Sequence, residues 1–357
     1  MQCKTHSIRS GYDGKQCLVH ARCCAAPDLL LATAQYLNVE GSDLFSGLFC
    51  SISRDHGETW SEFMPEEGLA AIREGDRITV GCDATPLYHR KTGKILLLGH
   101  TAQYREGDMS PTGEARKTFC SIYNPDTGHF GQMRFLEMPE GYDRCGNGSG
   151  QSVELENGDL LIPVYYYKGK DPFMASMVLR CRFDGENLTL LEMGNSLSMS
   201  IGRGLYEPSL VCHQGVYYMT MRNDECGCVA KSTDGLHYGN MHLWQWSDGS
   251  LLDNYNTQQH WMTVGDELYL VYTRRGADND HVFRHRAPLF AAKVENMKLR
   301  RDTETVLVGQ RGARLGNFGV TAWENGKALV MAAEWMQPKG CEKYGSDNSI
   351  FLAVAEP

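Results

Sequence analysis

The 357-residue sequence contains no apolar run that approaches the roughly 20 residues a helix needs to cross a bilayer. Its first residues, MQCKTHSIRSGYDGKQC, lack the apolar core of a secretory signal. Basic residues are not in excess either, because 35 Lys and Arg stand against 44 Asp and Glu, for a net charge of -9. We therefore expect neither nucleic acid nor a membrane to be a partner.

Paired cysteine motifs are missing as well. The 13 cysteines are an odd number and lie scattered, and no CxxC pair accompanies the Cys23-Cys24 and Cys226-Gly-Cys228 segments. We interpret them as reduced, buried thiols of a cytoplasmic protein rather than as disulfides or a zinc site. The sequence predicts no metal and no other cofactor, and it leaves the oligomeric state open.

Helical periodicity is nearly absent, since only residues 64–73 favour a turn or two of helix. What recurs is a tight turn followed by a short strand-like run, as in Asn157-Gly158 before DLLIPVYYY. Six such hairpin units follow one another at intervals of roughly 50–65 residues. They predict an all-β fold, a six-bladed β-propeller of four-stranded antiparallel blades in a single domain over residues 1–357. A pair of β-sandwiches is the alternative, which the even recurrence disfavours.

Several units also contain an Asp-Gly turn that precedes an aromatic residue. SRDHGETW at 53–60 and KSTDGLHY at 231–238 are the clearest examples. The Asp carboxylate can accept backbone N–H groups of the turn, and the aromatic ring can pack between neighbouring units. We interpret these turns as structural staples rather than as catalytic elements.

One hairpin, within residues 203–240, suggests where a site lies. Its strands run from Glu207 to the Gln214-Gly215 turn and back to Arg222, which places the guanidinium beside the carboxylate and near Tyr206. In a propeller, the corresponding strand ends of the other units should meet it at one mouth. They contribute further polar candidates: Arg22, Asp83, His100, Tyr165, Tyr167, Gln259, His260 and Arg274. The segment 274–290, rich in Arg, Asp and His, is typical of an active-site loop.

Taken together, segments along nearly the whole chain resemble a known family. SRDHGETW matches the Asp-box pattern in full and KSTDGLHY in part. Four further segments add to this: DATPLYHRKTGKILLL, GNGSGQSVELENGDLLIPVYYY, YEPSLV through MTMR, and RHRAPLFAAKV. They resemble the sialidase superfamily of six-bladed propellers, which implies an enzyme that acts on a carboxylate-bearing sugar.

The resemblance also implies roles for single residues. Asp43 takes the place of the acid/base aspartate, and Glu207 that of the carboxylate that polarises a nucleophilic tyrosine. The implied clamp on the substrate carboxylate is an arginine triad: Arg22, Arg222 and Arg286. Planar guanidinium forks bind carboxylates through paired hydrogen bonds, which suits this role. The implied sugar-pocket positions are Asp83, Tyr165 and Tyr167.

The chain departs from the family where the nucleophilic tyrosine is expected. Asn317-Phe318-Gly319 stands there, and a phenylalanine cannot attack an anomeric carbon. Either Tyr206 or Tyr344 reaches the site instead, or the chemistry differs. Strand alternation would point Tyr206 and Glu207 to opposite faces.

Three functions follow from this pattern. Exo-acting hydrolysis of an acidic sugar such as sialic acid ranks first, because the arginines and Glu207 match it best. A uronate lyase is second, with Arg222 neutralising the carboxylate while Tyr206 and His100 or His260 move protons. Of these histidines, His260 is favoured, because it begins a predicted axial strand. The third is a non-catalytic propeller that binds acidic glycans.

Overall fold

The computed structural model describes residues 1–142, 144–167, 169 and 171–357. Within these ranges the regular structure is strand, apart from five single-turn 3-10 helices: η1 (Glu67–Leu69), η2 (Phe283–His285), η3 (Arg301–Thr303), η4 (Glu324–Gly326) and η5 (Cys341–Tyr344). The helix favoured over residues 64–73 is reduced to η1. No helix of the described ranges has the length and apolar character needed to cross a membrane.

Three sheets have four strands each. The first contains β2 (Gln16–Ala26), β3 (Leu29–Asn38), β4 (Phe45–Ser53) and β5 (Met64–Pro65). The second contains β18 (Tyr206–His213), β19 (Val216–Arg222), β20 (Cys228–Ser232) and β21 (His242–Leu243). The third contains β27 (Phe318–Trp323), β28 (Lys327–Ala333), β29 (Ile350–Glu356) and β1 (Gln2–Arg9).

Two sheets are larger. A five-stranded one contains β22 (His260–Val264), β23 (Glu267–Tyr272), β24 (Leu289–Glu295), β25 (Lys298–Leu299) and β26 (Thr305–Val308). A twelve-stranded one is built on β6 (Ile72–Glu74), β7 (Arg77–His89), β8 (Lys94–Arg105), β9 (Arg116–Asn124), β12 (Arg144–Gly146), β14 (Asp159–Tyr167), β15 (Met174–Phe183) and β16 (Leu188–Met193). Its short outlying strands are β10 (His129–Phe130), β11 (Arg134–Phe135), β13 (Val153–Glu154) and β17 (Leu197–Ser198).

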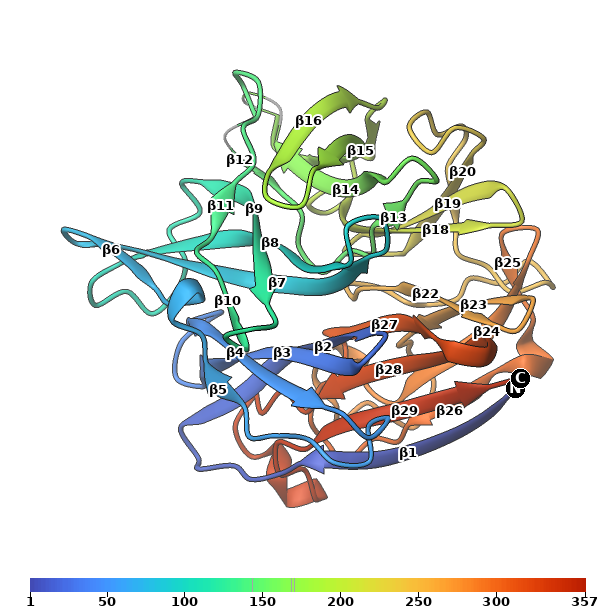
Figure 1. The fold of residues 1–357 in the computed structure, drawn as a ribbon. Coiled ribbons are helices and arrows are strands. Elements are labelled where there is room, and N and C mark those ends of the chain that lie inside the picture. Colours follow the sequence, from blue (N-terminus) through green and yellow to red (C-terminus); the bar gives the residue numbers. More distant parts are fainter. Residues whose placement is uncertain (143, 168, 170) are drawn as a thin grey trace.

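These sheets surround a common axis, as Figure 1 shows. Their first strands contact one another in turn, from β27 to β2 to β7 on one side and from β14 to β18, β22 and β27 on the other. The all-β propeller predicted from the hairpin repeats is therefore confirmed, with four-stranded sheets. The described chain does not form six separate sheets, because β12 pairs with both β9 and β14 and joins two hairpin groups into one.

The two ends of the chain close the ring. β1 pairs antiparallel with β29, with Gln2 opposite Glu356. The first residues of the chain therefore add the fourth strand to the sheet of β27, β28 and β29. Both termini lie side by side (Figure 1). Apolar side chains fill the space between this sheet and the first one, among them Leu18, Leu329 and Leu352, and their burial stabilises the closure.

The turn at 53–60 is fixed by the Asp55 carboxylate. It accepts hydrogen bonds from the Thr59 backbone N–H (2.9 Å), the Thr59 hydroxyl (2.5 Å) and the Ser53 hydroxyl (2.8 Å). Gly57 has a φ of +87°, a conformation that glycine adopts without strain. These bonds have the form expected of a structural staple.

Replacing Asp55 by alanine is expected to lower the melting temperature at neutral pH, because the turn loses all three bonds. Hydrogen bonds from Thr59 and Ser53 lower the pKa of Asp55 to about 2. A carboxyl group whose pKa is depressed on folding stabilises above its unfolded pKa and loses that effect as the pH falls towards the folded value. The melting-temperature gap to the wild type should therefore close between about pH 4 and pH 2.

Thermal scans across that pH range check this prediction. The Asp126→Ala variant is the matched control, because Asp126 lies in a similar turn and its carboxylate accepts no hydrogen bond from the described residues. A gap for Asp55→Ala that stays constant down to pH 2 would show that the carboxylate does not hold the turn.

Candidate active site

A cavity of about 210 Å³ opens at the axis, where β2, β7, β14 and β18 each deliver a side chain. Seven arginines line it: Arg116, Arg144, Arg203, Arg222, Arg284, Arg286 and Arg314. Three carboxylates face them: Asp43, Asp83 and Glu207. The chain as a whole is acidic, with a net charge of -9. A concentrated positive charge in an acidic protein favours an anionic ligand at this place.

β-bulges aim three ionisable side chains into the cavity. His20, Asp83 and Glu207 have φ values of +56°, +51° and +47°, and the ladder register shifts at each of them. A bulge breaks the alternation of a strand and redirects a side chain. Tyr206 and Glu207 therefore both line the cavity, although they are neighbours in the chain.

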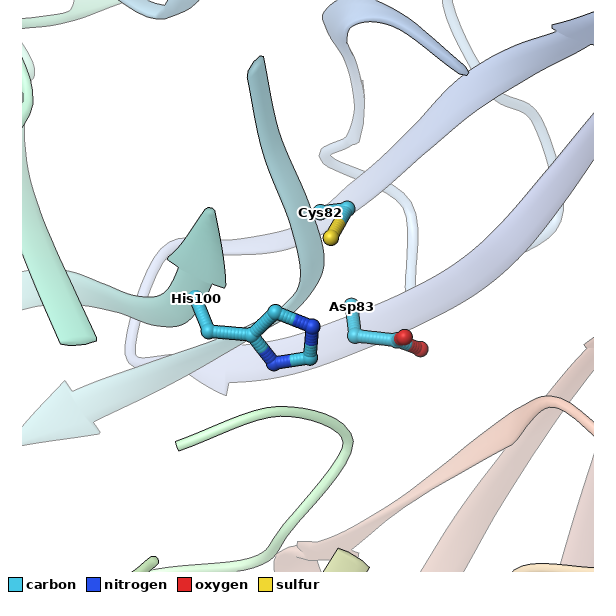
Figure 2. Close-up of side chains that lie close together, drawn as sticks. All are labelled: Cys82, Asp83 and His100. Atoms are coloured by element: carbon cyan, nitrogen blue, oxygen red, sulfur yellow. The ribbon is translucent and has the colours of Figure 1, made fainter. Parts of the chain in front are cut away.

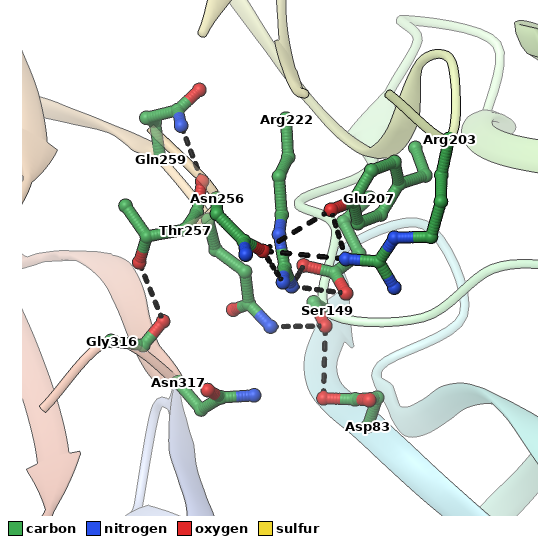
Figure 3. Close-up of polar contacts among 12 residues, drawn as sticks. Asp83, Ser149, Arg203, Glu207, Arg222, Asn256, Thr257, Gln259, Gly316 and Asn317 are labelled. Carbon is green, nitrogen blue, oxygen red and sulfur yellow. Dashed lines mark hydrogen bonds and ion pairs between the residues drawn. The ribbon is translucent and has the colours of Figure 1, made fainter. Parts of the chain in front are cut away.

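The hairpin contact between Glu207 and Arg222 is confirmed. Tyr206 lies opposite Arg222 in the ladder, and Arg222 Nη1 donates to both carboxylate oxygens of Glu207 at 2.8 and 2.7 Å. Arg222 Nη2 donates to Asn256 Oδ1 at 2.6 Å (Figure 3). Burial alone would lower the pKa of Arg222, but the adjacent Glu207 raises it above its ordinary value. The guanidinium is thus held charged and fixed in direction.

Arg286 and Arg314 are buried, and neither is paired with a carboxylate of the described residues. Arg286, which is 3% exposed, donates to the Asn256 carbonyl at 2.6 and 3.2 Å and to Asn317 Oδ1 at 3.2 Å. Arg314, which is 7% exposed, donates to Gln337 Oε1 at 3.2 Å. Neither forms an ion pair with a carboxylate in the described part of the chain. Burial and nearby arginines lower the pKa of Arg286, and burial lowers that of Arg314 to about 10.

The predicted arginine triad is therefore only partly right. Arg222 and Arg286 line the cavity, but Arg22 does not. It is fully buried behind Asp83, to which its Nη2 donates at 3.0 Å, and its Nε donates to the Phe318 carbonyl. The bulge before it turns His20 into the cavity instead. Arg314, which the sequence analysis missed, lines the cavity near Arg286.

Tyr206 is the tyrosine that reaches the site. Its hydroxyl donates to Asp224 Oδ1 at 2.7 Å and accepts from Arg203 Nη2 at 2.6 Å. The guanidinium groups of Arg203 and Arg222 each lie 4.7 Å from the centre of its ring. Burial raises the pKa of Tyr206 to about 12. The alternative, Tyr344, is 45% exposed on η5 and does not line the cavity.

Asn317 and Phe318 stand where the family resemblance places the nucleophilic tyrosine. Asn317 lines the cavity, whereas Phe318 is fully buried and its ring packs against that of His260 at 4.9 Å. His260 hydrogen-bonds Ser209 Oγ at 3.0 Å and Gln258 Oε1 at 3.3 Å and does not line the cavity. The prediction of a catalytic His260 is therefore not supported by its position.

Two other predicted binding residues also lie outside the cavity. Gln259 is buried and hydrogen-bonds Thr220 and the Thr257 carbonyl. Arg274 forms a two-bond ion pair with Glu304 at 2.8 and 2.7 Å, so its guanidinium is already neutralised. Neither side chain lines the cavity, so the structure does not support a binding role for either by position.

Asp83, Cys82 and His100 form a cluster at one side of the cavity (Figure 2). Asp83 accepts from Ser149 Oγ at 2.9 Å, and His20 and Arg22 hold its pKa below the ordinary value although burial alone would raise it. His100 is buried, and its Nδ1 has no hydrogen-bond partner among the described residues. Burial and Arg116 lower the pKa of His100 to about 3, so this imidazole is neutral.

This cluster has donor atoms that could hold a metal. One atom from each of Cys82, Asp83 and His100 lies within 4.8 Å of the others. A cation there would adjoin Arg22 and Arg116, whose charges oppose it. The surroundings therefore favour a neutral His100 next to an ionised Asp83 over a metal ion.

The remaining predicted residues do line the cavity or adjoin it. Asp43 is exposed at the rim, and Tyr165 lies under the Arg116 guanidinium, whose centre is 4.7 Å from the ring. Tyr167 adjoins the cavity, beneath Arg144 at 4.2 Å. The sequence analysis missed these arginines, together with Arg203. Arg203 is the first residue of the 203–240 segment that the sequence singled out, which is the one local signal that pointed to it.

The fold is that of sialidases. Trypanosoma rangeli sialidase has a TM-score of 0.69 at 13% identity over 99% of this chain and 59% of its own. Leech intramolecular trans-sialidase has a TM-score of 0.61 at 13% identity over 98% and 68%. The NanB sialidase of Streptococcus pneumoniae has 0.66 at 12% identity over 98% and 70%. The chain thus spans about three fifths of the first of these. No family model and no curated protein sequence matches it.

Proposed function

We propose that this chain is a glycoside hydrolase that removes a terminal sugar bearing a carboxylate, with sialic acid as the first candidate. The observation that carries the proposal is the pair of cavity arginines, Arg286 and Arg314, buried without a carboxylate partner among the described residues. An uncompensated buried charge is unfavourable, and a ligand carboxylate would supply the missing counter-charge. The fold supports this, since a T. rangeli sialidase of the same fold binds sialic acid.

Hydrolysis needs a proton donor and a group that meets the anomeric carbon. Asp43, exposed at the rim, would protonate the departing oxygen. The Tyr206 oxygen would attack the anomeric carbon while its proton passes to Asp224, with which it already shares a hydrogen bond. Water, deprotonated by Asp43, would then replace Tyr206, which recovers its proton. Asp224, which is paired with Arg203, thus takes the role that the resemblance implied for Glu207, because Asp224 and not Glu207 accepts the Tyr206 hydroxyl hydrogen bond.

The number of blades is a separate proposal. We infer that the twelve-stranded sheet comprises two blades, one on β7, β8 and β9 and one on β14, β15 and β16, with β12 as the link. Counted this way the propeller has six blades.

A uronate lyase is the second candidate, and His100 is what favours it. A neutral imidazole that lines the cavity could take a proton from carbon while the arginines neutralise the adjacent carboxylate. This reading uses His100 and not His260, which lies outside the cavity.

One assay separates these functions. The protein is incubated with an aryl sialoside, an aryl glucuronide, an aryl galactoside as the neutral control, and a polyuronate. We expect release of the aryl group from an acidic glycoside only, and no ultraviolet absorbance of an unsaturated uronate. Appearance of that absorbance would establish lysis instead. Binding of acidic sugars without turnover of any substrate would establish a glycan-binding protein and overturn both enzymatic proposals.

A further inference from the structure

Two arginines of the cavity stand side by side across a strand pair. Arg116 begins β9 and Arg144 begins β12, and the parallel ladder places them directly opposite each other. Like charges in this position repel each other and destabilise a sheet. Both side chains line the cavity, so a ligand bound there would be close to both positive charges.

The pair rests on a built platform. Arg116 lies over the Tyr165 ring at 4.7 Å and Arg144 over the Tyr167 ring at 4.2 Å. Both tyrosines come from β14, and strand alternation puts them on one face. Gly146 leaves the space that Arg116 occupies, because a Cβ there would lie 2.5 Å from Arg116 Cδ. The two guanidinium groups are therefore positioned by packing against rings.

Neither guanidinium has a counter-ion in the described ranges. Apart from the backbone ladder, neither the Arg116 nor the Arg144 side chain forms a hydrogen bond or ion pair with a described residue. The carboxylates that face this cavity are engaged elsewhere or lie at the rim: Glu207 with Arg222, Asp83 with Arg22, and Asp43 exposed. Two adjacent guanidinium groups stacked over aromatic rings, Arg116 half-buried and Arg144 exposed, have the chemistry of an oxyanion site.

This arginine pair is separate from the carboxylate clamp, which here means Arg222, Arg286 and Arg314, but it is within reach of the same ligand. Arg222 lies over the Tyr206 ring and Arg116 over the Tyr165 ring, and the centres of these two rings are 6.2 Å apart. The clamp and the pair thus flank two contacting tyrosines. One sugar, or two linked sugars, would span them.

We propose that the cavity recognises a sugar ligand with two anionic groups. The carboxylate binds Arg222, Arg286 and Arg314, as in the proposed function on which this inference rests. The second group binds Arg116 and Arg144. It is either a sulfate ester on the same sugar or the carboxylate of an adjoining acidic sugar. Both groups have two oxygens that can accept parallel hydrogen bonds from one guanidinium group.

Isothermal titration of the intact protein with matched ligand pairs tests this. One pair is sialic acid and a sialic acid O-sulfate, and another is sialic acid and its α2,8-linked dimer. Glucuronic acid and its O-sulfate form a third pair. We expect the dianionic member of at least one pair to bind about 10-fold or more tightly, the range of a charge-assisted contact. The pair that shows the gain identifies the source of the second charge.

Variants locate the gain. Arg116→Gln and Arg144→Gln should reduce the affinity ratio within that pair towards one, and Arg116→Lys should restore part of it. Arg301→Gln is the control, because Arg301 pairs with Asp248 outside the cavity and should keep the wild-type ratio. Melting temperatures of all variants report whether they fold.

The outcomes separate the two proposals. If sialic acid and glucuronic acid bind but their dianionic partners bind no better, the second anionic site is overturned and the carboxylate site of the proposed function is kept. If the gain persists in Arg116→Gln and Arg144→Gln, the site lies elsewhere and the assignment is wrong. If no acidic sugar of either kind binds, the proposed function and this inference both fall.

Discussion

The Arg286→Gln variant is expected to lose at least about 100-fold in kcat/KM on an acidic glycoside, because truncating one partner of a buried charge pair costs about 2–5 kcal/mol. The bound carboxylate would lose two charged donors and remain partly desolvated beside Arg222. Steady-state kinetics with the aryl sialoside, or with whichever acidic glycoside the wild type cleaves, measures this loss.

The same variant makes a second, opposite prediction about stability. Because Arg286 is buried without a carboxylate partner in the described residues, its replacement by a neutral amide should leave the melting temperature equal to or above that of the wild type. The matched control is Arg301→Gln, a half-exposed arginine of the same region that pairs with Asp248 outside the cavity and should keep full activity. A lower melting temperature together with full activity would assign Arg286 a structural role instead.

The Tyr206→Phe variant is expected to lose the chemical step while it keeps ligand binding. Removing the phenol oxygen removes the group that meets the anomeric carbon, so kcat should fall by about 1000-fold or more, with a much smaller change in the dissociation constant of the sugar. Single-turnover kinetics and titration with the free sugar separate these quantities.

Two further variants sharpen this test. Asp224→Asn should also lower kcat, because Asp224 acts through the Tyr206 hydroxyl, and it should shift the pH dependence of kcat. Tyr344→Phe is the control, since Tyr344 is exposed and away from the cavity. Undiminished turnover by Tyr206→Phe would exclude Tyr206 as the nucleophile and direct attention to His100.

Local patterns predicted part of the site well. The contact of Glu207 with Arg222 follows from a hairpin with a short turn, which fixes its own ends. Arg286 and Asp83 came from the family resemblance, and both line the cavity. The all-β propeller followed from the repeated turns. The Glu207–Arg222 contact and the propeller are encoded within one hairpin or in the spacing between hairpins.

The errors have a common physical cause in strand bulges. At β2 the bulge at His20 redirects the strand, so His20 enters the cavity and Arg22 packs behind it. β22 has no such bulge, and His260 therefore stays in a regular ladder opposite Val271 and points at Phe318. A bulge of one residue leaves no clear signal in the sequence, yet it decides which side chain faces the axis.

Residues delivered by loops were missed for a different reason. Arg314, Asn256 and Asp224 lie outside the strands and reach the site only through contacts between distant segments. The separation of β9 from β14 likewise hides the stacking of Arg116 on Tyr165. Such juxtapositions depend on how the sheets are placed around the axis, which hydrophobic periodicity does not specify.

The central claim is that the axial arginines grip a ligand carboxylate, and a crystal structure of the protein soaked with sialic acid or with the acidic sugar it cleaves tests this most directly. We expect the carboxylate within hydrogen-bond distance of Arg222, Arg286 and Arg314, with the anomeric carbon facing Tyr206. A sugar bound with its carboxylate turned to solvent, or bound outside the axial cavity, would contradict it.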